Sequence, residues 1–281
     1  MIGVVIRTLN EAEHIGTCLE TLARQAPGFV LDVLVVDSGS NDDTIAIARG
    51  HGARVHEISP EDFDYSTAIN VGIERVEGDL ILILSAHAIP VDDGWIAAMV
   101  APFEDERVAG VASRQVPWPG APLREVLRLA REFSEAGRVY DEPPVLFSNA
   151  ASCVRRSVWA EQPFTLPAAE DMEWAARVVG AGWTVVYQGE AAVYHSHDET
   201  PRAQAQRMID VNRVDDEDRP LRKTLREAAG IVYRDTRMIL GFDEPPGRRL
   251  AHLWELAQMV FFYVVDFRRS GSIAERRRTR S

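Results

Sequence analysis

The feature that most constrains the fold is an alternation of short apolar runs with segments of helical spacing along the first third of the chain. The apolar runs lie at residues 2–6, 31–37, 53–58 and 80–85. Such alternation is typical of βαβ units and a parallel sheet. Right-handed crossovers bring the carboxyl ends of these strands to one edge of the sheet, where ligands of such folds bind. The residues that follow each run are therefore the first candidates for a functional site.

Polar residues follow three of these runs, in the segments RTLNE, DSGSNDDT and SAHAIP. The second segment alone is also explained as a turn, because Gly39 permits a tight turn and Asp42 or Asp43 can cap the next helix. Three polar strand ends at one edge favour a binding site instead. The candidates at these ends are Thr8, Asn10, Glu11, Asp37, Ser38, Ser40, Ser85 and His87.

The sequence lacks the two common phosphate-binding loops of nucleotide-binding folds. No GxGxxG follows the first strand, and no GxxxxGK[ST] occurs anywhere in the chain. Such loops hold a phosphate with backbone N–H groups at a helix start. Other residues must therefore hold a diphosphate if this sheet binds one.

Composition excludes one class of partner and suggests a compartment. The 281 residues carry a net charge of -12, which argues against a nucleic-acid surface because neutralising phosphates requires clustered Lys and Arg. The two cysteines, Cys18 and Cys153, lack metal or redox spacing, and we expect a reducing cytoplasm. The chain opens directly on a strand, so we expect no cleaved signal.

The C-terminal part is expected to be helical. Its longest apolar stretch, residues 253–267, contains Glu255 and Asp266, and we expect it to be too short and too interrupted to span a membrane. The tail RRSGSIAERRRTR after it is rich in arginine. Two interpretations stay open, a contact with an anionic membrane surface or partner and a plain solvated terminus.

The middle of the chain departs from the βαβ pattern. A Pro-rich, then helical, then Pro-rich segment at 116–144 indicates a crossing segment, and a short strand and helix follow at 147–159. A further helix opens at Ala169 and ends near Gly180 or Gly182, before a strand at 183–187. We expect three parts, residues 1–115, residues 116–200, and a helical region with a basic tail at 201–281.

Motifs in the same order along residues 8–197 resemble those of family 2 glycosyltransferases, in particular the bacterial rhamnosyltransferase-like branch. They are TLNE, VVDSGSNDDT, FDYSTAINVGIE, LSAHAIP, SRQ, FSNAASCVRRSVW, AEDMEWA and VYHSH. The resemblance implies an α/β GT-A fold, with a Rossmann-like, mostly parallel sheet flanked by helices and a C-terminal helical extension. Within this fold, residues 1–115 would bind the nucleotide-sugar, and residues 116–200 would form the acceptor-binding and catalytic part. The resemblance also implies inverting transfer of a sugar, rhamnose among the candidates, from a UDP- or dTDP-linked donor. The acceptor would be a saccharide or a lipid-linked molecule in cell-surface glycan synthesis.

The resemblance assigns donor-binding roles to residues at the strand ends and in the following loops. Carboxylates there can accept hydrogen bonds from a base N–H and from ribose hydroxyls. For Glu11, stabilisation of a helix N-terminus is an equally good explanation. For Asn149, an ordinary turn or cap role is also open. The implied donor-binding set is Thr8, Asn10, Glu11, Asp37, Ser38, Ser40, Asn70, Ser85, Arg114 and Asn149.

A metal site is implied in altered form. GT-A enzymes usually place Asp-x-Asp where this chain has Ser85-Ala86-His87, and imidazole suits Mn²⁺ better than Mg²⁺. His195 and His197 are further candidate ligands. Alternation along an extended segment would point them to opposite sides, with His197 slightly favoured. If both only bind backbone, arginines such as Arg114 or Arg202 must neutralise the diphosphate.

The segment AEDMEWA supplies the implied catalytic base. In an inverting transfer a carboxylate accepts the proton of the attacking hydroxyl. The resemblance gives this role to Asp171, and its neighbour Glu170 can raise one of the two pKa values. The alternative is an acid-rich helix N-terminus. Trp118 is expected either to form a platform for the acceptor sugar or simply to be buried.

Two other classes compete with this interpretation. A sugar-1-phosphate nucleotidyltransferase is opposed by RTLNEAEHIG, which does not resemble the Gly-rich basic loop of that class. A degenerate GT-A scaffold that binds nucleotide or a partner without turnover is favoured by the missing Asp-x-Asp and opposed by AEDMEWA and VYHSH. Peripheral contact with the inner face of the cell membrane and a homodimer are both compatible with the sequence.

Overall fold

The computed structural model describes residues 1–25, 28–197, 200–215, 220–242 and 245–269. Most of the basic tail lies outside these residues. The chain forms two compact units, Met1–Trp118 with Glu132–Ser196, and Pro119–Arg131 with His197–Ser281. The expected three-part division by function stays a prediction.

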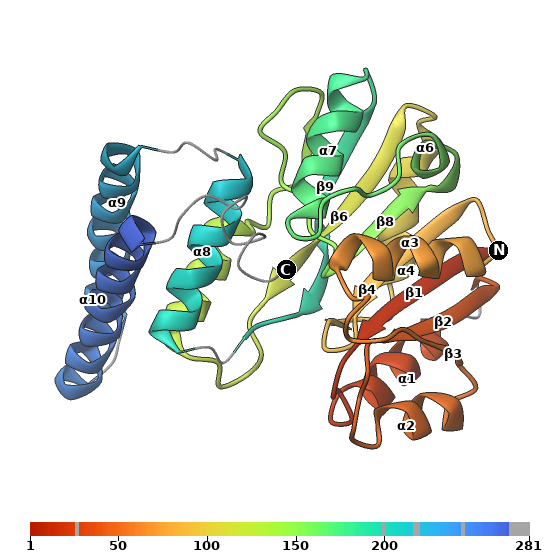
Figure 1. Cartoon of the computed structure of the whole chain (residues 1–281), viewed down its shortest axis with the longest axis horizontal. Coiled ribbons are helices and arrows are strands. Elements are labelled where there is room, and N and C mark those ends of the chain that lie inside the picture. The colour runs from red at the N-terminus through yellow and green to blue at the C-terminus, as the bar shows by residue number, and fades with distance from the viewer. Residues whose placement is uncertain (26–27, 198–199, 216–219, 243–244, 270–281) are drawn as a thin grey trace. The chain divides into compact units, whose positions relative to one another are not determined.

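The first half of the sheet is parallel, as the alternating pattern predicts. It contains β1 (Ile2–Thr8), β2 (Leu31–Asp37), β3 (Arg54–Glu57) and β4 (Leu80–Ser85). β1 lies between β2 and β4, and β3 forms the edge beyond β2 (Figure 1). Most apolar side chains of β1, β2 and β4 are buried on both faces, which explains their near-continuous apolar runs, whereas the edge strand β3 is partly exposed.

The second half makes the sheet mixed. β8 (Ala151–Arg155) runs antiparallel between β4 and β6 (Val108–Val116), and β9 (Thr184–Tyr194) runs parallel to β6. The short strands β5 (Ile89–Pro90) and β7 (Arg138–Tyr140) both pair antiparallel with β9. Among the described residues this gives one nine-stranded sheet.

Helices cover both faces of this sheet. The α1 (Ile15–Gln25), α2 (Thr44–Gly50) and α4 (Trp95–Val100) helices pack on the face that carries Val4 and Ile6. The α3 helix (Tyr65–Arg75) packs on the opposite face. It approaches β1 so closely that a Cβ on Gly72 would overlap the side chain of Val5. The other helices of this unit are the 3-10 helix Ala101–Glu104, α6 (Arg156–Glu161) and α7 (Glu170–Gly180).

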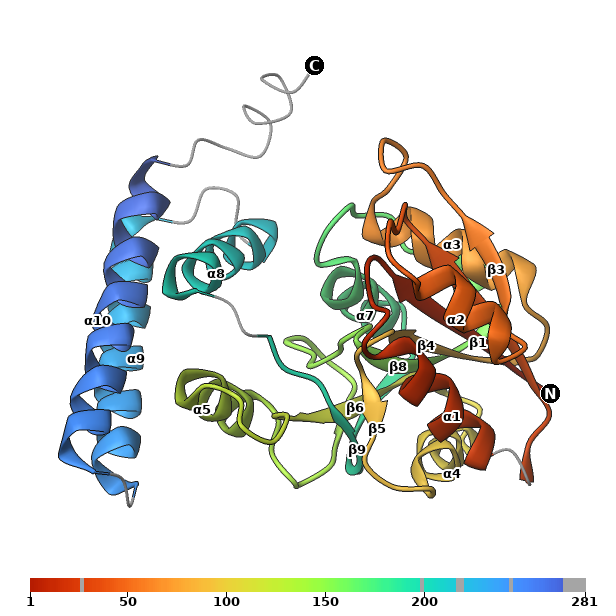
Figure 2. The ribbon, with the colours of Figure 1, turned by 90° about the horizontal axis from the view of Figure 1, so that it is seen from below.

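The second unit is helical. It contains α5 (Leu123–Glu132), α8 (Pro201–Asp215), α9 (Leu221–Gly241) and α10 (Pro246–Arg269), and α9 and α10 lie side by side (Figure 2). Its core residues are Leu127, Ala205, Ile209, Ala228, Ile231, Ile239, Leu256, Met259, Tyr263 and Phe267.

The α10 helix is longer than its most apolar stretch. Its residues Pro246–Phe267 are long and apolar enough to span a membrane by length and composition alone, a test that a core helix of a soluble protein also passes. The expectation that this stretch is too short was therefore wrong on length, because the helix begins at Pro246, ahead of the apolar run. Glu255 and Asp266 still interrupt it.

Candidate active site

The carboxyl ends of β1, β2 and β4 meet at one edge of the sheet, as expected. Thr8 is the register partner of Asp37, and Arg7 is the register partner of Ser85. The polar residues of three separate sequence segments are therefore neighbours. This edge is where a ligand of an open α/β sheet is expected to bind.

The turn after β2 is organised by Asp37, which is fully buried. Its Oδ1 accepts hydrogen bonds from the backbone N–H groups of Gly39 (2.9 Å) and Ser40 (2.8 Å), and its Oδ2 accepts one from Ser40 Oγ (2.5 Å). Gly39 has φ 101°, which favours glycine. These bonds match the turn interpretation of Asp37, so its contact with a donor base stays a prediction.

The loop after β1 is tied to that turn. Asn10, with φ 55°, donates its N–H to Ser40 Oγ (2.8 Å) and accepts from Asn41 N–H (2.9 Å). Ser38 Oγ donates to the carbonyl of Thr8 (3.2 Å). Among the described residues, Thr8 Oγ1 is buried without a hydrogen-bond partner. The two loops thus form one rigid rim beside the strand ends.

A cluster of imidazoles lies at the end of β4. His87 Nδ1 is 2.6 Å from Glu11 Oε1, and the His87 ring stacks on the buried His195 ring with centroids 4.8 Å apart and planes at 10°. His195 Nδ1 is 2.8 Å from Gln115 Oε1. The candidate ligand atoms of His87, His195 and His197 all lie within 4.8 Å of one another.

The expectation that His195 and His197 point to opposite sides was wrong, and which of them faces a donor stays a prediction. That expectation assumed that strand alternation continues through both residues, but β9 ends at Tyr194. Beyond the strand the period of two no longer applies. Since His197 follows His195 by two residues, both imidazoles can lie beside His87.

The donor set fits a divalent transition-metal ion. Three imidazoles offer ring nitrogens, and Glu11 and Gln115 engage the Nδ1 atoms of two of them. Such outer partners fix the tautomer of a ligating histidine and leave Nε2 for the metal. Imidazole ligands suit Mn²⁺ better than Mg²⁺.

Trp118 belongs to a short stack of rings. It stacks on His14 with centroids 5.6 Å apart and on Tyr194 with centroids 5.0 Å apart. Its side chain is partly buried. The packing interpretation of Trp118 accounts for these contacts, and an acceptor platform stays a prediction.

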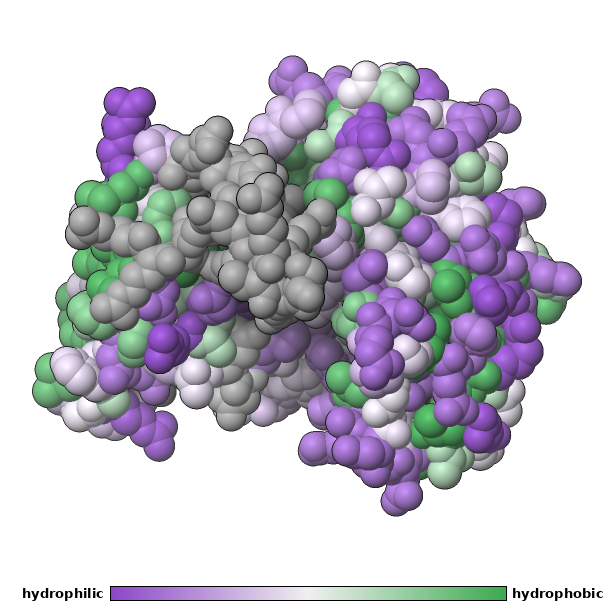
Figure 3. Space-filling view, in the orientation of Figure 1, coloured by the Kyte–Doolittle hydropathy of each residue, from purple (hydrophilic) through white to green (hydrophobic). Residues whose placement is uncertain are grey.

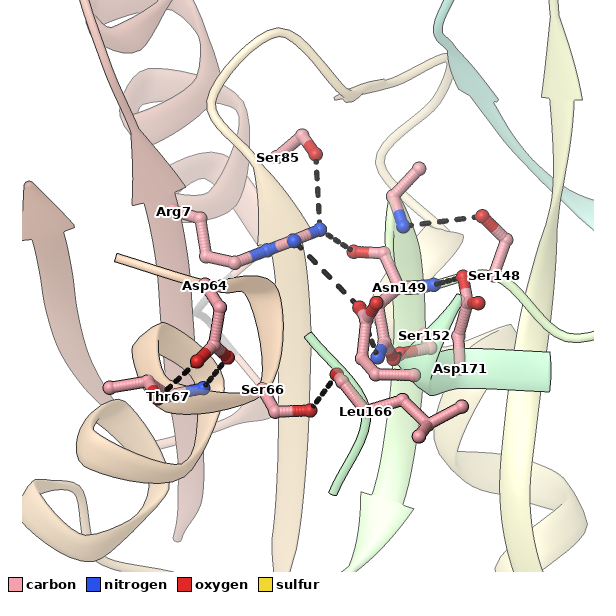
Figure 4. Close-up of polar contacts among 12 residues, drawn as sticks. Arg7, Asp64, Ser66, Thr67, Ser85, Ser148, Asn149, Ser152, Leu166 and Asp171 are labelled. Atoms are coloured by element: carbon pink, nitrogen blue, oxygen red, sulfur yellow. Dashed lines mark hydrogen bonds and ion pairs between the residues drawn. The ribbon is translucent and has the colours of Figure 1, made fainter. Parts of the chain in front are cut away.

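A pair of adjacent carboxylates begins α7. Ala169, with φ 53°, turns the chain into the helix, and Glu170 and Asp171 follow. Asn149 donates its N–H to Asp171 Oδ2 (3.1 Å) and its side-chain Nδ2 to Glu170 Oε1 (3.2 Å) (Figure 4). Glu170 is 4% exposed, whereas Asp171 stays partly exposed. Asp171 is therefore the more accessible residue of the pair, and its two carboxylate oxygens accept the N–H groups of Asn149 and Met172.

Arg7 connects this pair to the strand ends. Its Nη2 donates to the Asn149 carbonyl (2.9 Å) and lies 3.5 Å from Ser85 Oγ, while its Nη1 is 3.9 Å from Glu170 Oε1 (Figure 4). Its guanidinium also lies 5.1 Å from the centroid of the Tyr65 ring. Sequence reasoning missed Arg7, although a charged residue at the end of a buried apolar run was a usable signal.

Burial shifts the pKa of both carboxyl groups upward. Desolvation is the main cause for Glu170, with the charge of Asp171 second, and together they raise the pKa of Glu170 to about 7. Desolvation also raises the pKa of Asp171, against the opposing N–H groups of Asn149 and Met172. Arg7 lowers both pKa values. Two interacting carboxyl groups with raised pKa values, close to the edge of the sheet where ligands bind, are typical of a catalytic pair.

Three predicted donor-binding residues make other contacts. Asn70 donates to the Phe164 carbonyl (2.8 Å) and accepts from Trp159 Nε1 (2.8 Å), so both ends of its amide cross-link α3 to another segment. Arg114 pairs with Glu135 (3.0 Å), and Arg202 pairs with Asp266 (3.4 Å). Diphosphate contacts from these residues stay predictions that this geometry does not favour.

Fold and site together define a glycosyltransferase of the GT-A type. The family model described as "Glycosyl transferase family 2" matches residues 3–161. Over 222 residues the chain is 31% identical to the O-antigen chain rhamnosyltransferase RfbN of Salmonella typhimurium, and the alignment covers 74% of this chain and 70% of that protein. The chain therefore belongs to glycosyl transferase family 2.

Solved structures agree on the fold. The mannosyltransferase PcManGT from Pyrobaculum calidifontis, in complex with GDP-Man and Mn²⁺, has a TM-score of 0.57 at 17% identity, covering 97% of this chain and 76% of that chain. A glucosyl-3-phosphoglycerate synthase from Mycobacterium tuberculosis, in complex with Mn²⁺, UDP-Glc and phosphoglyceric acid, has a TM-score of 0.52 at 20% identity. That alignment covers 75% of this chain and 78% of that chain.

Proposed function

We propose that this protein transfers a sugar, with inversion, from a nucleotide-sugar to an acceptor hydroxyl, with Asp171 as the general base. The observation that carries this proposal is the pair formed by Glu170 and Asp171, in which Glu170 is buried and Asp171 is partly exposed beside the strand ends. A non-catalytic scaffold would have no use for two interacting carboxyls at this depth, whose ionisation is costly. A scaffold without turnover is not favoured.

The reaction is a single displacement. The acceptor oxygen forms a bond to the anomeric carbon, the bond from that carbon to the donor phosphate oxygen breaks, and the nucleoside diphosphate leaves with the electron pair. Asp171 accepts the hydroxyl proton. General-base catalysis of this kind contributes about 10²–10⁴-fold to a rate. Glu170 contacts Arg7 and Asn149. Through these contacts it would hold Asp171 in position and balance the charge of Arg7.

His87, His195 and His197 are the residues that would hold a divalent ion, with Mn²⁺ the better match. A bound ion would supply positive charge to neutralise the donor diphosphate. Glu11 would orient His87 for this task. The donor-binding roles of Thr8, Asn10, Asp37, Ser38 and Ser40 belong to the same proposal.

The donor and acceptor follow by analogy. We propose a UDP- or dTDP-linked sugar as donor, with rhamnose supported by the name of the Salmonella relative. The acceptor would be a saccharide or a lipid-linked glycan of the cell surface. A lipid-linked acceptor would place the enzyme in the cytoplasm at the inner face of the membrane.

Replacing Asp171 with Asn tests the base. We expect Asp171→Asn to lower the transfer rate by about 10²–10⁴-fold while donor affinity stays within about twofold, because only the proton acceptor is lost. The measurement is nucleoside diphosphate release with saccharide and lipid-linked acceptors, beside donor binding by calorimetry. Glu173→Gln is the matched control, since Glu173 lies on the same helix turn and pairs with Arg177. Equal rates for wild type and Asp171→Asn would refute the assignment.

A further inference from the structure

The α10 helix carries an exposed apolar face. Leu250, Trp254 and Phe261 are 67%, 66% and 60% exposed, and the exposed Ala257 lies between them. Their spacing of four, three and four residues places them on one side of a helix. Figure 3 shows hydrophobic residues at the surface over α9 and α10. A contiguous exposed apolar face of this kind marks an interaction surface.

The α9 helix presents a similar face. Leu225, Val232 and Leu240 are exposed at spacings of seven and eight residues, and Tyr233 is exposed beside Val232. The two helices pack against each other and against a shared core. Exposed Trp and Tyr side chains on an apolar surface are typical of a water–membrane boundary, because their rings are apolar at one end and polar at the other.

The acidic residues of this helix pair are all engaged within the helical unit. Asp235 pairs with Arg131 (2.7 Å), Glu255 with Arg124 (3.0 Å) and Asp266 with Arg202 (3.4 Å). Glu227 accepts a hydrogen bond from Tyr263 Oη. Asp235 is buried, and the other three side chains are partly buried. Negative charge is therefore withdrawn from the surface of α9 and α10.

The basic residues of the same helices are largely exposed. This contrasts with the whole chain, whose net charge is -12. The exposed members are Arg222, Lys223, Arg226, Arg234, Arg237 and Arg248. The sequence that follows α10 adds Arg276, Arg277, Arg278 and Arg280 against the single acid Glu275. The exposed charged side chains that the structure describes on α9 and α10 are thus basic, whereas the sequence segments on either side of α9 contain the acids Asp215, Asp216, Glu217, Asp218, Asp243 and Glu244.

We propose that α9 and α10 dock on an anionic lipid membrane, with their apolar faces in the interface and their basic residues against the lipid head groups. Amphipathic helices with these two features bind membranes through buried apolar area together with attraction to anionic lipid. The ion pairs of Glu255 and Asp266 tie α10 to α5 and α8, which favours a helix that lies on the membrane over one that crosses it. A symmetric pair of chains would bring like charges together, which disfavours a second copy as the occupant.

This surface deepens the proposed function, because it would hold the enzyme where a lipid-linked acceptor lies. Only this biological role of the surface rests on the proposed function, and membrane binding itself does not. Vesicle binding needs no turnover. An active enzyme that ignores vesicles would refute the docking surface alone, and an inactive protein that binds them would refute the transfer reaction alone.

The test is co-sedimentation of the full chain with vesicles of phosphatidylcholine alone or mixed with phosphatidylglycerol. We expect at least about tenfold tighter binding to the anionic vesicles, weakening as salt is raised. The double variant Trp254→Ser, Phe261→Ser and the double variant Arg226→Glu, Arg234→Glu should each weaken binding about tenfold or more. Val139→Ser and Arg49→Glu, at exposed positions of the other unit, should leave it unchanged.

Circular dichroism melting establishes that each variant is folded before it is compared. Equal binding to both vesicle types, or undiminished binding by both double variants, would overturn the proposal. Sedimentation equilibrium without vesicles measures whether the chain forms a dimer through this face. A dimer that dissociates in the Trp254→Ser, Phe261→Ser variant would assign the face to a second copy of the chain and overturn the membrane as its occupant.

Discussion

Arg7 shows how much of the candidate active site depends on a single side chain. It brings a positive charge to the end of β1, where it contacts Ser85, the Asn149 carbonyl and Glu170. Ser85 stands where the GT-A resemblance implies the first carboxylate of a metal-binding triplet. In the proposed mechanism the imidazoles would bind the metal, and the positive charge of Arg7 would act on Glu170 and Asp171.

The pH dependence of stability follows from Glu170. Its folded-state pKa is raised to about 7, so it contributes stability below its ordinary pKa that is lost as pH rises through about 7. The pKa of Asp171 is raised as well. We therefore expect the Glu170→Gln variant to gain stability relative to wild type as pH rises toward 7, by at most about 1.4 kcal/mol for each pH unit in that range. Urea unfolding at a series of pH values measures this difference.

Arg7 provides the control for that prediction. Its guanidinium lowers the pKa of both carboxyls, so Arg7→Gln should move the loss of stability to higher pH, and Arg7→Lys should restore part of the effect. Ser85, Asn149 and Tyr65 also contact Arg7 and are retained in every variant. A stability difference between Glu170→Gln and wild type that stays constant with pH would contradict the account.

The sequence allowed some of these residues to be predicted and not others. Asp171 and His87 lie in motifs that carry the family resemblance, so short segments were enough to select them. Arg7 and Gln115 act through partners far away in the chain, Glu170 and His195, which only the register of the sheet brings within reach. Asn70 looked available in its motif, but Phe164 and Trp159 occupy its amide.

Among the elements, α3 sets the spacing between the helix layer and the sheet. A Cβ on Gly72 would overlap Val5 and lie 3.2 Å from Val36. Gly72→Ala should therefore destabilise the fold by about 1–3 kcal/mol through overpacking. Gly50→Ala, at the end of α2 with open space around its Cβ position, should be near neutral. Urea denaturation compares them, and similar midpoints for the two variants would show that α3 can move away from the sheet.

The elements themselves were predicted unevenly. The α3 helix, Tyr65–Arg75, is one of the segments of helical spacing between the apolar runs, and the parallel strands β1 to β4 follow from those runs. The antiparallel insertion of β8 between β4 and β6 was not predicted, because an apolar run has the same composition in either direction. Local sequence carries no signal for strand direction when the connection is long and irregular.

At the scale of the whole molecule, charge is distributed unevenly between the chain as a whole and the α9 and α10 helices. The chain is acidic overall, yet the exposed charged side chains described on α9 and α10 are basic, and the acids of these helices pair inside the helical unit. The family and the fold of the sheet unit could be predicted from collinear motifs. The proposed docking face could not be located from the sequence, because spacing alone does not tell which side of a long helix faces its own core.

The measurement that tests the central claim most directly is thermal unfolding of the full chain with UDP, dTDP, GDP or CMP, each with EDTA, Mg²⁺ or Mn²⁺. A ligand that binds only the folded state raises Tm. We predict that UDP or dTDP raises Tm most with Mn²⁺, and that His87→Ala removes the contribution of the metal. If no nucleotide raises Tm under any metal condition, the strand ends are not a nucleotide-sugar site and the account is wrong.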